Sequence, residues 1–183
     1  MKTYVFLYDK FADFEIAPLL LLMKEKTDII TFSFERGIQE SEEQLKVVVD
    51  KSLDEVDPND IDLLIIPGGN PEPYREREDL HDLLRNVQAR GRVIAAICGG
   101  PGFLAHAGLL KGIRIAHGYA PEDAERVFDG SIITEEDVIV EGNIITARGQ
   151  AFAEFAVAVC EILGFIDNHE EAKATLEWLK NVR

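Results

Sequence analysis

The sequence predicts an α/β protein with a mostly parallel sheet that helices cover on both faces. Short apolar runs alternate along the chain with segments of helical periodicity, an order typical of βαβ units. Several of these runs are apolar throughout, as expected for strands that are buried on both faces of a sheet. The chain of 183 residues is long enough for one sizeable core, and no linker or repeat divides it. We therefore expect a single domain over residues 1–183.

The first half of the chain carries four of the expected strands. They cover residues 3–8, 28–34, 45–50 and 61–66, with the third at a sheet edge or in a small excursion. A helix is expected over 14–26, with Asp13 as its N-cap and Pro18 in its first turn, and a polar loop over 35–43. A second helix is expected over 79–90, where apolar residues recur at helical spacing.

The second half continues the alternation. A buried strand is expected over 92–97, followed by a segment of helical composition over 103–107 and a short strand over 112–116. Residues 137–146 are expected to form two strands about a tight Gly142-Asn143 turn. An apolar helix over 150–163, ended by Gly164, and an amphipathic helix over 168–179 complete the chain.

Composition excludes several classes of function. The formal net charge of −15 disfavours binding to nucleic acids and to anionic membranes, and no apolar run is long enough to span a bilayer. The first residues resemble a strand and not a signal peptide, so a cytoplasmic location is expected. The presence of only two cysteines, Cys98 and Cys160, disfavours a disulfide framework, and two thiols alone cannot form a zinc cage. We expect neither a metal nor a cofactor, and a small molecule as the binding partner.

Cys98 is the most informative residue. It ends the apolar run 93–97 and is followed at once by Gly99, Gly100 and Pro101, where the next helix begins. Glycines allow a sharp strand-to-helix turn that leaves a thiol uncovered, and a helix N-terminus favours the thiolate. The pattern is that of a nucleophile elbow with cysteine in place of serine. Cys160, in contrast, lies in an apolar helix and is expected in the core.

Four predicted strands end in residues that are candidates for a catalytic or binding site: Tyr8-Asp9, Pro67-Gly68-Gly69, Cys98 and His117. The carboxyl ends of parallel strands gather at one edge of a sheet, so we expect these ends to form one site. The N–H groups of Gly69 and Gly99 are candidates for an oxyanion hole beside the sulfur.

Two titratable residues are candidate partners of Cys98. Glu15 has apolar neighbours on both sides, so burial is expected to raise the pKa of its carboxyl and suit it to acid/base work. The alternative for Glu15 is a first-turn residue that complements the helix dipole. His117 follows a strand and is placed to reach the sulfur, but a structural histidine fits the pattern equally well.

Together these motifs resemble the ThiJ/PfpI superfamily of the class I glutamine amidotransferase-like fold. The likeness rests on Ala95–Pro101, on Pro67–Asn70, on Glu15 in the first helix and on Thr146–Gly149 before an apolar helix, and it extends from about residue 3 to residue 164. The resemblance implies a flavodoxin-like three-layer α/β/α sandwich, usually a homodimer, with Cys98 and Glu15 as the characteristic pair. It also places His117 where one branch carries a histidine near the site.

Members of that superfamily differ in reaction. They include glyoxalase-type and protein-deglycating enzymes, isocyanide hydratases, chaperones, oxidative-stress sensors and proteins assigned as peptidases. The peptidase-like branch commonly has histidine directly after the cysteine, whereas this chain has Gly99. We therefore expect a cysteine-dependent enzyme that acts on reactive carbonyls through Cys98, with Glu15 as acid/base. The alternatives are a stress-protection protein or chaperone that uses oxidation of Cys98, and an amidase, peptidase or glutamine amidotransferase-like hydrolase.

Overall fold

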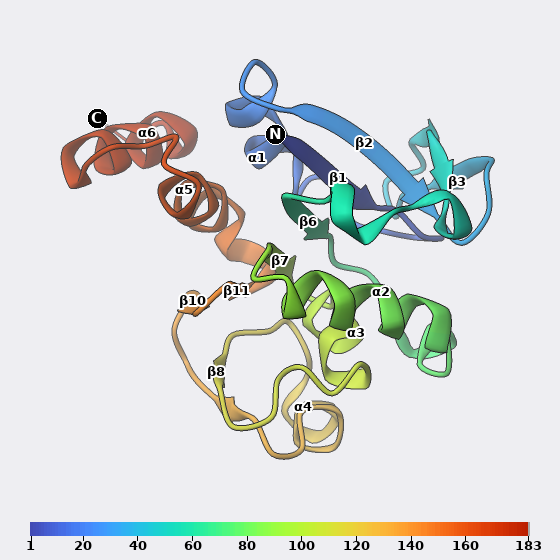
Figure 1. Ribbon diagram of the computed structural model, residues 1–183. Helices are drawn as coiled ribbons and strands as arrows, with labels where there is room; N and C mark the ends of the chain where they lie inside the picture. The colour runs from blue at the N-terminus through green and yellow to red at the C-terminus, as the bar shows by residue number, and fades with distance from the viewer. Residues whose placement is uncertain (183) are drawn as a thin grey trace.

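A seven-stranded sheet forms the centre of the molecule in the computed structural model, which describes residues 1–182 (Figure 1). Its strands, in spatial order, are β10 (Val138–Glu141), β11 (Ile144–Ala147), β7 (Val93–Ile97), β6 (Leu63–Ile66), β1 (Lys2–Phe6), β2 (Asp28–Ser33) and β5 (Lys51–Ser52). All neighbours pair in parallel except β10 and β11, which form an antiparallel hairpin. The predicted mostly parallel α/β fold is therefore confirmed.

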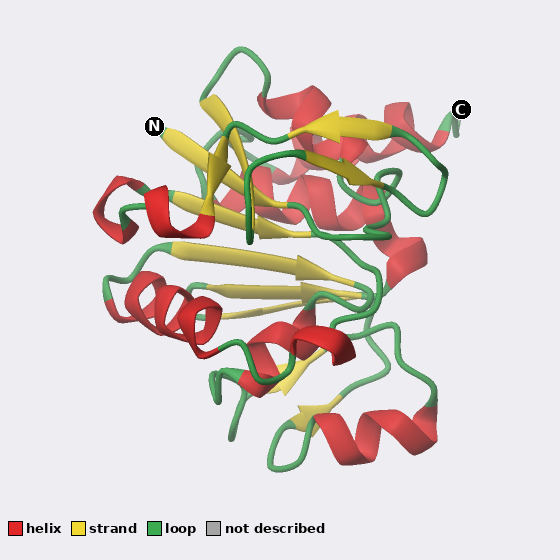
Figure 2. Ribbon diagram, turned by 90° about the vertical axis from the view of Figure 1, so that its right-hand side faces the viewer, coloured by secondary structure: helices red, strands yellow, loops and turns green. Residues whose placement is uncertain are grey.

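Helices lie on both sides of this sheet, which gives the three layers visible in Figure 2. One side carries α1 (Ala17–Met23), α5 (Phe152–Ile162) and α6 (His169–Lys180), and the other carries α2 (Glu78–Ala89) and α3 (Pro101–His106) (Figure 1). The central strands β6 and β7 are buried almost throughout, which explains their continuous apolar sequence. None of the helices in the described chain is long and apolar enough to cross a membrane.

Two small sheets and several short helical turns extend the central fold. The strand pairs are β3 (Ile38–Glu40) with β4 (Lys46–Val48), and β8 (Arg114–Ile115) with β9 (Ile132–Ile133). The helical turns are η1 (Leu53–Glu55), η2 (Pro58–Asp60), η3 (Glu72–Tyr74) and η4 (Gly149–Ala151), and helix α4 (Pro121–Val127) follows β8. The strand expected over 45–50 is thus a small excursion, as predicted, whereas the loop expected over 35–43 contains β3.

The first helix begins later than the sequence predicts. Helix α1 starts at Ala17 and contains Pro18 in its first turn, but Asp13 does not cap it. The Asp13 carboxylate instead accepts a hydrogen bond from Ser41 Oγ at 2.7 Å. Residues 14–16 form a turn, so Glu15 lies before the helix and not on it. The segment 14–16 thereby brings Glu15 to the carboxyl edge of the sheet.

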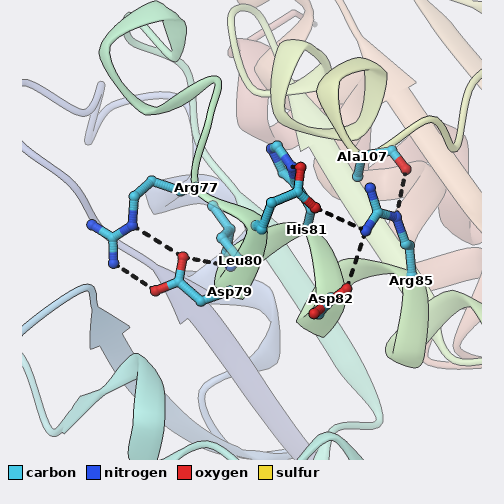
Figure 3. A network of polar contacts seen from close by, with 8 residues as sticks. Arg77, Asp79, Leu80, His81, Asp82, Arg85 and Ala107 are labelled. Atoms are coloured by element: carbon cyan, nitrogen blue, oxygen red, sulfur yellow. Dashed lines mark hydrogen bonds and ion pairs between the residues drawn. The ribbon is translucent and has the colours of Figure 1, made fainter.

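Helices α2 and α3 are tied together on their side of the sheet by a polar network (Figure 3). Arg85 Nε donates to the carbonyl of Ala107, just past the end of α3, at 3.0 Å. The same guanidinium lies 3.1 Å from Asp82, and the buried His81 lies 3.3 Å from Glu78. The bond from Arg85 to Ala107 links α2 to the end of α3, the helix that follows Cys98, and the other bonds lie within residues 77–85.

Candidate active site

Cys98 lies at the carboxyl end of β7 in a left-handed backbone conformation, with φ of +59°. Such a φ costs a non-glycine residue free energy and occurs mainly where the surrounding structure enforces it. Here the Cys98 N–H donates to the carbonyl of Ala147 at 2.9 Å, and the Cys98 carbonyl accepts from the N–H of Gly118 at 2.7 Å. These bonds hold the sharp turn between β7 and α3, which is the nucleophile-elbow geometry.

Two glycines that the sequence analysis did not single out form the walls around the sulfur. A Cβ atom on Gly118 would lie 2.7 Å from Cys98 Sγ, and one on Gly149 would lie 2.9 Å from both Cys98 Sγ and Glu15 Oε1. Neither glycine has a positive φ, so the space around the sulfur and not the backbone conformation requires glycine here. Gly149 follows β11, the neighbour of β7 in the sheet.

Glu15 lies against this thiol and is almost completely buried, with 2% of its surface exposed. Its Oε2 accepts a hydrogen bond from the N–H of Gly68 at 2.7 Å, and its carboxyl is also hydrogen-bonded to Cys98. Burial raises the pKa of Glu15 to about 7, although the hydrogen bonds from Cys98 and Gly68 act in the opposite direction. The carboxyl therefore exchanges a proton in the neutral range, as acid/base work requires.

The thiol is not stabilised as a thiolate in the way the sequence alone suggests. Burial, the negative charge of Glu15 and the hydrogen bond to Glu15 raise the pKa of Cys98 to about 12. The N–H of Gly99, which is hydrogen-bonded to the sulfur, acts in the opposite direction. Because the carboxyl and the thiol are in contact, the two groups titrate as a pair, and the pair loses its first proton near pH 7. Proton exchange with Glu15 is thus the route to a thiolate.

A cavity of about 380 Å³ opens onto Cys98. Gly69 and Gly99 line it on the sheet side, and their backbones are in such close contact that Gly99 has no space for a Cβ atom beside the Gly69 carbonyl. Pro71, shortly after Gly69, and Tyr119, directly after Gly118, also line the cavity. The structure therefore brings together Cys98, Glu15, Gly69 and Gly99. In the described chain, no three metal-ligating side chains form a cluster.

His117 has a different environment from the other predicted site residues. Its Nδ1 accepts a hydrogen bond from the N–H of Tyr119 at 3.0 Å, and its ring stacks on Phe128 with 4.8 Å between ring centroids. It lines a separate cavity of about 350 Å³ together with Arg148. The strand before it, β8, lies outside the main sheet, so His117 is not at one of the main sheet's strand ends. A role of His117 in the reaction stays a prediction.

Cys160 is confirmed as a core residue. It is 1% exposed in α5, and burial raises the pKa of its thiol to about 11.

Comparison with known proteins shows the family to which this fold belongs. Residues 1–162 match the model of the DJ-1/PfpI family. The chain belongs to the DJ-1/PfpI family. It is 33% identical to Deglycase PfpI of Pyrococcus furiosus and 34% identical to a deglycase of Thermococcus kodakarensis, each over 81% of this chain and 90% of the relative. A DJ-1 superfamily protein of Agrobacterium tumefaciens, at 29% identity, superposes with a TM-score of 0.84 over 98% of this chain and 97% of that one.

The resemblance to the ThiJ/PfpI superfamily is thereby confirmed. Helix α6 lies beyond the residues that match the DJ-1/PfpI family model.

The role of Gly118 as a wall can be tested with Gly118→Ala. The added methyl group would lie 2.7 Å from Cys98 Sγ, so the sulfur or the 117–119 segment must move. We expect alkylation of Cys98 by iodoacetamide to slow by about tenfold to a hundredfold, because small displacements of a reacting atom have effects of this size. The alkylation rate is followed by mass spectrometry, and an unchanged melting temperature shows that the fold persists. An unchanged rate would contradict the assignment of Gly118 as a wall.

Burial of the Glu15 carboxylate also predicts a pH-dependent stability. Because the folded protein raises the pKa of Glu15 from 4.5 to about 7, the folded state binds this proton more tightly than the unfolded state. Stability due to this group is therefore lost as pH rises from about 4.5 through about 7. The glutamine in Glu15→Gln cannot ionise, so this pH-dependent loss of stability does not occur in the variant. We therefore expect the free energy of unfolding of Glu15→Gln to exceed that of wild type by up to about 3 kcal/mol above pH 7, with little difference near pH 4.

Denaturant unfolding at pH 4 and pH 8 measures this difference. Glu170→Gln, at an exposed position in α6, is the matched control and should change stability little at either pH. An equal effect of Glu15→Gln at both pH values would contradict the buried, proton-exchanging carboxyl.

Proposed function

We propose that the protein converts small reactive carbonyl compounds, and α-oxoaldehydes such as methylglyoxal in particular, through a covalent adduct on Cys98. The observation that carries the proposal is the contact between a thiol in a nucleophile elbow and a buried carboxyl whose pKa is about 7. The family relatives named deglycases support carbonyl chemistry of this kind.

The first step forms a bond between sulfur and the aldehyde carbon. Glu15 takes the thiol proton, Cys98 Sγ attacks the carbonyl carbon, and Glu15 returns the same proton to the carbonyl oxygen. This gives a hemithioacetal and leaves Glu15 as a carboxylate. The N–H groups of Gly69 and Gly99 are the proposed donors to that oxygen as its negative charge develops.

The second step moves hydrogen from one carbon of the adduct to the next. Glu15 removes the proton from the former aldehyde carbon and returns it to the adjacent carbon, while the hydroxyl proton of the adduct passes to the neighbouring carbonyl oxygen. The former ketone thereby becomes a hydroxyl group, and the hemithioacetal becomes a thioester of a 2-hydroxy acid. Water then cleaves the thioester, releasing lactate from methylglyoxal and restoring the thiol. The sum is addition of one water molecule to the substrate, so no external oxidant or reductant is required.

The alternatives have less support. A cysteine hydrolase for amides needs a base such as histidine, and among the described residues that line the Cys98 cavity none is a histidine. The same Cys98–Glu15 pair would also serve a redox sensor, and what favours carbonyl chemistry over it is the deglycase naming of the relatives.

Product analysis tests the proposal. Purified protein is incubated with methylglyoxal, and separately with glutamine, and lactate and ammonia are measured. We expect lactate from methylglyoxal and no ammonia from glutamine. Absence of lactate would overturn the proposed function, and ammonia release would favour the amidase alternative.

A further inference from the structure

The cavity above Cys98 has one wall of charged side chains that the proposed chemistry does not use. Glu72 comes from η3, and Asp123 and Arg126 come from α4. The cavity is also lined by Gly69, Gly99 and Gly118, which carry no side chains. A substrate bound to the sulfur would therefore place its remaining atoms near the charged wall.

The single cation of this wall is already paired. Arg126 lies 3.3 Å from Asp123 through Nη2 and 3.7 Å from Glu72 through Nη1. Both carboxylates raise the pKa of Arg126, as expected of an occupied guanidinium. Among the described residues that line the cavity, none is a second arginine or a lysine. Two carboxylates thus face one guanidinium, and the wall carries a net negative charge.

Glu72 also has a neighbour behind the wall. Its Oε1 lies 3.7 Å from Nε2 of His106, and both atoms are buried without a hydrogen-bond partner. Burial lowers the pKa of His106, so the imidazole is neutral near pH 7 and does not offset the carboxylates.

We propose that Glu72, Asp123 and Arg126 select uncharged α-oxoaldehydes and reject those that carry a carboxylate. A substrate carboxylate in this cavity would lie beside two like charges and find no free cation. This inference rests on the proposed function and adds to it a substrate class and the residues that determine it.

Two matched probes test the selection: an α-oxoaldehyde that ends in a carboxylate on a two-carbon spacer, and the methyl ester of the same compound. The measured quantity is kcat/KM for the carboxylate divided by kcat/KM for the ester. We expect wild type to favour the ester clearly at low salt. The double variant Glu72→Gln with Asp123→Asn frees Arg126 and should raise the ratio about fivefold to tenfold, which is the size expected for two partly exposed charge pairs.

Three further arms make the test specific. Arg126→Gln should lower the ratio below that of wild type, and this result does not depend on the double variant folding well. Glu170→Gln removes one negative charge from α6, which lies far from α4 in Figure 1, and should leave the ratio unchanged. High salt should reduce the gain of the double variant, because ions screen exposed charges.

The outcomes separate the two proposals. Equal use of carboxylate and ester by wild type, or an unchanged ratio in both the double variant and Arg126→Gln, would overturn the selection while leaving the proposed function intact. If wild type converts neither of the two probes and does not convert methylglyoxal, the proposed function is overturned, and the selection with it.

Discussion

Replacement of Cys98 by serine is expected to abolish lactate formation from methylglyoxal. The serine hydroxyl fits the same space, but its proton is held too tightly for the Glu15 carboxylate to remove it. Loss of the nucleophile of an enzyme typically lowers kcat by on the order of a thousandfold to a millionfold. The rate is measured by enzymatic determination of lactate at a saturating concentration of methylglyoxal.

Cys160→Ala is the matched control for this prediction. It removes the other thiol of the chain, which is buried in α5 away from the Cys98 cavity. We expect activity per folded molecule to stay close to that of wild type. If Cys98→Ser forms lactate at the wild-type rate, the covalent adduct on Cys98 is ruled out.

Replacement of Glu15 by glutamine should have the second largest effect on turnover. Glutamine preserves the size of the side chain and still offers an oxygen to the N–H of Gly68, but it cannot take or return a proton. General acid–base groups typically contribute about a hundredfold to ten-thousandfold to a rate, so we expect a loss of that order in kcat/KM. Stopped assays of lactate over a pH series provide the measurement.

The pH dependence of the wild type should reveal the same pair. Because the Cys98–Glu15 pair loses its first proton near pH 7, kcat/KM should rise with pH through about 7 and then level off. In Glu15→Gln this rise near pH 7 should be absent. A variant with the wild-type pH profile would contradict the role of Glu15 as the proton acceptor.

Much of the framework was predictable from the sequence because it depends on local patterns. The apolar runs predicted buried strands over 61–66 and 92–97, and the corresponding strands β6 and β7 lie at the centre of the sheet. The glycines after Cys98 indicated a strained turn, and Cys98 does adopt a positive φ. The apolar surroundings of Glu15 correctly indicated a buried carboxyl with a raised pKa.

Other features depend on contacts between distant segments and left no local pattern. Helix α4 has a polar, charged sequence without a clear apolar stripe, so it was not predicted. Gly118 and Gly149 become walls of the site only because β8 and β11 lead them to the same sulfur. The charged wall joins Glu72 to Asp123 and Arg126 across about fifty residues of chain. Strand β11 lies beside β7 in the main sheet, whereas β8, the strand before His117, belongs to a separate small sheet.

The direction of the Cys98 pKa shows what a sequence pattern omits. The pattern drew attention to the helix N-terminus, which favours a thiolate, whereas burial and the Glu15 charge outweigh it in the folded protein. A homodimer, a cytoplasmic location and the oxyanion role of Gly69 and Gly99 stay predictions.

Proton sharing between Cys98 and Glu15 is the central claim, and the pH dependence of Cys98 alkylation tests it most directly. Iodoacetamide modification of Cys98 is followed by mass spectrometry from pH 5 to pH 10 in Cys160→Ala and in the same chain with Glu15→Gln. We expect an inflection near pH 7 in the first protein, where the pair loses its first proton. In the second, we expect no inflection near pH 7 and modification only at higher pH, because burial still disfavours the thiolate. An inflection near pH 7 that persists after Glu15→Gln would contradict the shared proton.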